Sequence, residues 1–88
     1  MLFRSAEIYT NLGLLQMAQG KWKEARASLE RAVAQNPSMP EGWLNLGIFR
    51  DVYEGDAQKA RECYEKYSNI TTYRRKEVDA WIGWLRGP

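Results

Sequence analysis

The stretch Trp43-Leu44-Asn45-Leu46-Gly47 decides the fold, because the chain carries an earlier version of it, Tyr9-Thr10-Asn11-Leu12-Gly13. The two leucines before the glycines and the two glycines themselves are each 34 residues apart (46 − 12 and 47 − 13). A repeat of this length, apolar and interrupted by one glycine, is typical of helical hairpins stacked side by side. We therefore expect an all-α fold.

A glycine turn and an alanine-led helix follow each copy, at Gly20 with Ala25 and at Gly55 with Ala60. Gly20 suits the position after a helix end, where a left-handed backbone is needed. The glycine inside the first helix, Gly13, costs about 1 kcal/mol relative to alanine, so we expect it to let the next helix approach closely. The patterns predict helices over about 5–19, 21–35, 39–53 and 57–69, and a fifth from about residue 71.

Each predicted helix has an apolar face. In the first helix it is formed by Tyr9, Leu12, Gly13 and Gln16, and in the second by Ala25, Leu29, Ala32 and Val33. In the third it holds Trp43, Leu46 and Gly47, in the fourth Ala60, Tyr64 and Tyr67, and in the fifth Val78, Trp81, Ile82 and Leu85. Ser38 is the predicted N-cap of the third helix, with Pro40 in its first turn. The turn after Leu46 is one residue longer than the turn after Leu12.

Composition excludes most chemistry. Eighty-eight residues make one small domain with a net charge of +2, too low to indicate nucleic acid. Cys63 is the single cysteine and histidine is absent, so there is no base for a nucleophile, no zinc ligand set and no internal disulfide. We expect no catalysis, metal or cofactor. The chain also lacks the apolar runs of a secretory signal or a membrane span, so we expect a cytoplasmic protein and no membrane partner.

The chain resembles tetratricopeptide repeat proteins. The family pattern is met in the first unit by Tyr9, Leu12, Gly13, Ala25, Leu29, Ala32 and Pro37, and in the second by Trp43, Leu46, Gly47, Ala60, Tyr64 and Tyr67. Gln16 and Arg50 depart from it, standing where the family usually has an aromatic or large apolar residue. The resemblance implies a right-handed α-α superhelix of five helices within 1–88, with repeats over about 6–39 and 40–73 and a capping helix over about 73–86.

The resemblance also implies a concave groove lined by the first helix of each hairpin. Its residues would be Thr10, Asn11, Leu14 and Met17 from the first helix and Leu44, Asn45, Ile48 and Asp51 from the third. Some members clamp a carboxylate with an asparagine and basic residues, but here Leu14 and Ile48 stand at the asparagine position and Thr10 and Leu44 stand where lysine would help. We therefore expect a protein or peptide ligand that is apolar, with one basic residue facing Glu41 or Asp51. Alternatively, part of this strip belongs to the core or is covered by the last helix.

A third face of the first helix carries Ile8 and Leu15. A helix that is apolar nearly all round is normally buried all round, so a second hypothesis is self-association through these residues. A second copy, another partner or further repeats could cover them. RNA binding, as in the pentatricopeptide relatives, is the least favoured class, because the inner face lacks a basic stripe. The sequence thus favours a non-enzymatic interaction module over a self-associating domain.

Overall fold

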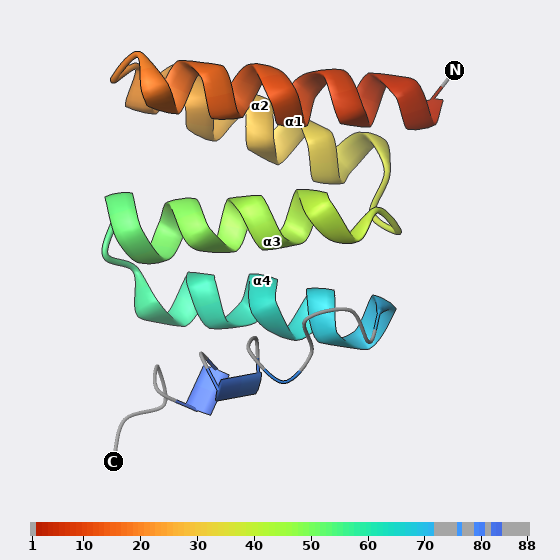
Figure 1. The fold of residues 1–88 in the computed structure, drawn as a ribbon, viewed down its shortest axis with the longest axis vertical. Coiled ribbons are helices and arrows are strands. Elements are labelled where there is room, and N and C mark those ends of the chain that lie inside the picture. Colours follow the sequence, from red (N-terminus) through yellow and green to blue (C-terminus); the bar gives the residue numbers. More distant parts are fainter. Residues whose placement is uncertain (1, 72–75, 77–78, 81, 84–88) are drawn as a thin grey trace.

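The computed structural model describes residues 2–71, 76, 79–80 and 82–83, and these contain helices and no strand. The elements are α1 (Leu2–Ala18), α2 (Trp22–Gln35), α3 (Pro40–Ile48), the π-helical segment η1 (Phe49–Tyr53) and α4 (Ala57–Ile70). Two antiparallel hairpins, α1 with α2 and α3–η1 with α4, are stacked along the longest dimension (Figure 1). The predicted all-α class is confirmed.

The predicted fifth helix lies mostly outside the described residues. Lys76, Asp79–Ala80 and Ile82–Gly83 are helical, whereas Val78, Trp81 and Leu85 of its predicted stripe are not among the residues described. Five helices and a right-handed superhelix therefore stay predictions. None of the helices in the described part is both long and apolar enough to cross a bilayer.

Two glycines inside helices are points of close approach between the helices of each hairpin. A Cβ atom on Gly13 would lie 2.7 Å from Leu29 Cγ, and one on Gly47 would lie 2.7 Å from Tyr64 Cε1. Both distances are too short for a real side chain, so the expected reason for these glycines is confirmed. At the turns, Gly20 and Gly55 have φ of 76° and 66°, the left-handed region that glycine adopts without strain.

The second hairpin has one more residue before its turn glycine than the first, and η1 accommodates it. The Glu54 N–H donates to Phe49 O at 3.2 Å, five residues back, whereas an α-helix would bond four residues back. The predicted continuous helix over 39–53 is thus interrupted, because one additional residue must fit before Gly55 without rotating the helix that precedes it. A π turn takes up that residue locally and leaves the register of α3 unchanged.

Ser38 is not the N-cap of the third helix. Met39 holds that position with no side-chain cap, and Pro40 is the first helical residue. The Ser38 N–H donates to Asn36 Oδ1 at 3.1 Å, so the serine forms part of a turn that ends before the helix begins. The predicted place of Pro40 in the first turn is confirmed.

One apolar cluster joins the two hairpins. It consists of Ala25, Leu29 and Val33 from α2, Leu46 and Phe49 from α3–η1, and Cys63 from α4. The exposed ion pairs Arg26–Glu54, at 3.0 Å, and Arg50–Glu30, at 3.2 Å, lie beside it, and Trp22 stacks on Tyr53 with ring centroids 4.7 Å apart. Exposed pairs of this kind contribute at most about 1 kcal/mol each, so apolar burial dominates the contact.

The packing face of α1 differs from the predicted one. From residue 4 onward, where burial in α1 is described, Ala6, Thr10 and Gly13 are buried, while Leu12 is 39% exposed. Ser28 donates its hydroxyl to Gln16 Oε1 at 2.6 Å, so a polar contact is formed at one of the two positions where the family usually has an aromatic or large apolar residue. Leu12 thus lies at the edge of the face, toward solvent.

Candidate functional site

The predicted groove residues come from α1 and α3–η1, the first elements of the two hairpins. Asn11 and Leu14 are exposed, Leu14 at 40%, whereas Met17 is half-buried against the core. On the second hairpin Asn45, Ile48 and Asp51 are half-buried. These six residues have side-chain surface open to solvent.

The other two predicted groove residues are buried. The Thr10 hydroxyl donates to Ala6 O at 2.9 Å within its own helix. Leu44 packs in a second apolar cluster with Ala60, Tyr64, Tyr67 and Ile82. Part of the predicted strip is therefore core, and one residue covering it, Ile82, comes from the C-terminal segment. For Leu44, then, the alternative prediction holds: this part of the strip belongs to the core.

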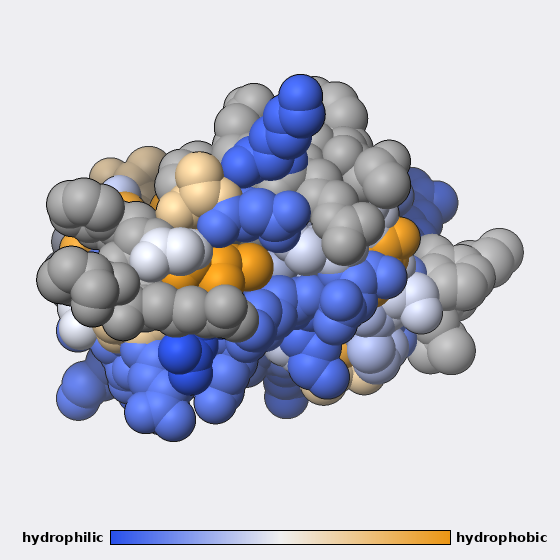
Figure 2. All heavy atoms as spheres, turned by 90° about the horizontal axis from the view of Figure 1, so that it is seen from below, coloured by the Kyte–Doolittle hydropathy of each residue, from blue (hydrophilic) through white to orange (hydrophobic). Residues whose placement is uncertain are grey.

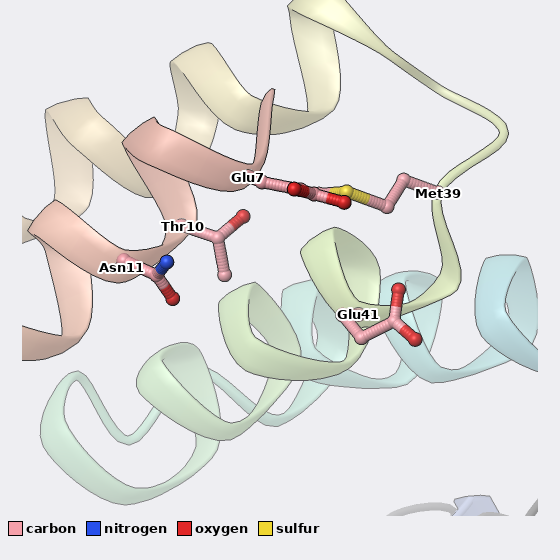
Figure 3. Close-up of a pocket in the computed structure, with 5 residues that line it drawn as sticks. All are labelled: Glu7, Thr10, Asn11, Met39 and Glu41. Carbon is pink, nitrogen blue, oxygen red and sulfur yellow. The ribbon is translucent and has the colours of Figure 1, made fainter. Parts of the chain in front are cut away.

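A hollow of about 280 Å³ opens between α1 and the start of α3. It is lined by Glu7, Thr10, Asn11, Met39 and Glu41. The side chains come from α1, from the start of α3 and from Met39 of the linker between the hairpins; Glu7 and Met39 extend toward one another, and the Glu41 carboxylate lies on the Met39 side (Figure 3). Two carboxylates and a thioether at such a hollow suit the long, partly apolar side chain of lysine or arginine.

A second hollow, of about 290 Å³, lies at the other end of α3 and is lined by Ile48, Asp51, Val52 and Tyr64. The Tyr64 hydroxyl donates to Asp51 Oδ2 at 3.3 Å, which holds the carboxylate at one side of an otherwise apolar surface. Ile48 and Asp51 were predicted for the groove, and the structure brings them together here.

Glu7 and Met39 were missed as lining residues from the sequence. Glu7 could have been found, because Glu7 and Glu41 are 34 residues apart (41 − 7), as are the predicted groove residues Asn11 and Asn45 (45 − 11). Met39 carried no such signal, since it lies in the linker before α3. The self-association residues Ile8 and Leu15 lie away from both hollows and are each 56% exposed.

The Cys63 thiol is in contact with the Arg50 guanidinium. Arg50 Nη1 donates to Cys63 Sγ at 3.6 Å, with Nη2 on Glu30. Burial nevertheless raises the pKa of the Cys63 thiol, an effect that Arg50 opposes only in part. A buried thiol held protonated is a poor nucleophile. In the described residues no cluster of three or more Cys, Asp or Glu side chains could hold a metal ion.

The stability of the fold should fall as pH rises above about 9. Burial, and then the charge of Asp51, raises the pKa of the Tyr64 hydroxyl above its ordinary 10.0, as burial raises that of the Cys63 thiol above 9.0. The folded state therefore keeps protons that the unfolded chain releases first, so this stability is present below pH 9 and lost above it. Urea unfolding midpoints at about pH 7.5 and pH 10.5 measure the loss.

The control for this prediction is Tyr64→Phe, which keeps the ring but removes the titrating hydroxyl. Its midpoint should fall less than that of the wild type between the two pH values, because only Cys63 of the pair still titrates. Equal falls in both proteins would contradict the assignment to Tyr64.

A sequence model of the tetratricopeptide repeat family matches residues 10–67, which include the whole second copy of the repeated stretch and the first copy from Thr10 onward. The chain is a tetratricopeptide repeat protein. Tetratricopeptide repeats generally mediate protein–protein interaction and are typically non-catalytic. No curated protein matches the chain. In this repeat protein the first hollow is lined by α1, Met39 of the linker and the start of α3, and the second by the end of α3, η1 and Tyr64 of α4.

Proposed function

We propose that this tetratricopeptide repeat protein is a non-enzymatic module that binds an apolar peptide segment carrying a basic residue in the groove along α1 and α3. The observation that carries the proposal is the hollow shared by Glu7 and Glu41. It combines two carboxylates from adjacent hairpins, and Glu41 is one of the two residues, with Asp51, that the sequence proposed to face a basic side chain.

Apolar contacts beside the hollow support the same ligand. Leu14 is exposed on α1, and Ile48 lines the second hollow with Asp51. An extended or helical peptide could place its basic side chain between Glu7 and Glu41 and its apolar side chains on Leu14 and Ile48. Opposite charge would then orient the peptide, and apolar burial would supply most of the affinity.

The test is selection of peptides from a displayed random library on the wild type, followed by affinity measurement on variants. We expect apolar peptides with a lysine or arginine, and a loss of about tenfold or more in Leu14→Glu, Ile48→Glu, since each change puts a charge on an apolar contact. Glu7→Gln, Glu41→Gln should retain apolar peptides but lose the preference for a basic residue. Ile70→Glu is the matched control, because Ile70 is 38% exposed at the end of α4.

Two outcomes would overturn the groove proposal. One is the enrichment of no peptide on the wild type. The other is that the selected peptides bind Leu14→Glu, Ile48→Glu as tightly as the wild type, which would place the contact elsewhere.

A second candidate function is self-association through Ile8 and Leu15. The observation that favours it is their exposure: both are more than half exposed on the helix at one end of the stack (Figure 1). Self-association and groove binding use different faces of α1, so each can be tested without the other.

A further inference from the structure

The outer face of α1 carries a row of exposed apolar side chains. Ile8, Leu12 and Leu15 follow one another at i, i+4 and i+7, the spacing of residues on one helix face. They are 56%, 39% and 56% exposed. We call these three residues the α1 row.

The repeat itself shows what kind of surface this is. One period later, at 34 residues from each member of the α1 row, stand Gly42, Leu46 and Phe49, all buried. Leu46 and Phe49 pack in the cluster that contains Ala25, Leu29 and Val33 of α2. A Cβ on Gly42 would lie 3.1 Å from Val33 Cγ1. Within this chain, then, the same row on the next hairpin is covered by a helix.

In the part of the chain that the structure describes, α4 at the opposite end of the stack presents no comparable row of exposed apolar side chains. On α4, Tyr64 and Tyr67 are buried together with Ile82 of the C-terminal segment, and Ser68 Oγ donates to Asp79 Oδ1 at 3.1 Å. Seen from that end, most of the described surface is hydrophilic (Figure 2). Head-to-tail stacking of α4 on the α1 row would have to displace these contacts.

The α1 row is, however, complementary to itself. Suppose that a second α1 lies antiparallel to the first, with the two-fold axis passing midway between Asn11 and Leu12. Ile8 of each copy then faces Leu15 of the other, and the two Leu12 side chains lie close together. The same arrangement places Arg4 opposite Gln19 and Glu7 opposite Gln16, so no like charges meet. A two-fold axis requires this kind of self-complementary patch.

We infer that the α1 row binds a second copy of this chain, with the two α1 helices antiparallel across a two-fold axis near Leu12. The inference deepens the second candidate function, self-association, and does not depend on the groove. Three side chains per copy make an interface smaller than the roughly 1,200 Å² of stable complexes. The dimer is therefore weak and concentration-dependent.

Sedimentation equilibrium from low micromolar to about 1 mM protein measures the association. The wild type shifts from monomer toward dimer across this range, and Leu15→Lys raises the dissociation constant by about tenfold or more. The circular dichroism spectrum and unfolding midpoint of dilute Leu15→Lys match those of the dilute wild type, because Leu15 contacts solvent in the monomer. Wild type that stays monomeric throughout, or Leu15→Lys that dimerises as well as the wild type, overturns the inference.

Disulfide trapping tests the orientation, and the buried native Cys63 leaves the introduced thiols as the reactive ones. A mixture of Ile8→Cys and Leu15→Cys proteins forms the mixed disulfide in excess over either homodimer, and Leu12→Cys forms a homodimer. Ile70→Cys, at an exposure close to that of Leu12, is the matched control and stays monomeric. An excess of Ile8→Cys homodimer overturns the antiparallel arrangement while self-association stands; absence of any dimer overturns both.

Discussion

Replacing Gly47 with valine should lower the free energy of unfolding by about 3 kcal/mol or more. A Cβ there would lie 2.7 Å from Tyr64 Cε1 and 3.1 Å from Cys63 Cβ. Tyr64 and Cys63 are both fully buried, so neither can yield without opening the contact between α3 and α4. Valine gains only a few tenths of a kcal/mol of helix propensity over glycine, far less than the clash costs. Urea unfolding measures the difference.

Two other glycines serve as controls for this substitution. A Cβ on Gly13 would meet the Leu29 side chain, which has more rotational freedom than an aromatic ring, so Gly13→Val should cost less than Gly47→Val. Helical Gly83 has nothing within 4 Å of such a Cβ, and Gly83→Ala should be neutral or slightly stabilising. If Gly47→Val were as stable as the wild type, Gly47 would not be a point of close approach.

Deleting Asn45 should prevent folding, whereas deleting Val52 should cost no more than about 1–2 kcal/mol. Loss of Asn45 rotates the preceding part of α3 by about 100° against the part that follows, so Leu44 and Leu46 can no longer both face the core. Two buried side chains contribute about 3–6 kcal/mol together, most of the stability of a domain this small. Val52 is exposed and lies in η1, where its loss would only convert the π turn to an α turn.

Far-ultraviolet circular dichroism and urea unfolding of the two deletion variants check this prediction. Without Val52, Leu46 and Gly55 would be eight residues apart, as Leu12 and Gly20 are (20 − 12). The two turns would then have equal lengths. An unfolded Val52 deletion, or a folded Asn45 deletion, would contradict the view that η1 holds the extra residue.

The repeat period predicted the hairpins because residues one period apart occupy equivalent packing positions in the two hairpins. Gly13 and Gly47 recur at the period for the reason expected, and α2 and α4 bury the alanines and large residues that their patterns indicated. The break of α3 at η1 was visible only as one surplus residue, since nothing in the sequence says whether such a residue lengthens a turn or distorts a helix. Ser38 was wrong as the N-cap because it lies in the turn at Asn36, and the N-cap position falls one residue later, at Met39.

The groove was harder to predict than the fold. Periodicity places a residue on a helix face, but whether that face meets solvent depends on neighbours from elsewhere in the chain. Leu44 shows this: it follows the groove spacing, yet Tyr64, Tyr67 and Ile82 cover it. The Glu7–Glu41 hollow likewise required both hairpins in place before its two carboxylates met around one space.

The thinness of the stack has a mechanical consequence. The molecule measures 39 × 27 × 16 Å, so its shortest dimension is little more than the about 10–12 Å diameter of one helix. The hairpins follow one another along the longest dimension (Figure 1), and the contacts that resist a pull along it are the apolar cluster, the two ion pairs and the Trp22–Tyr53 stack between them. We expect the two hairpins to separate at that junction under load before either one unfolds.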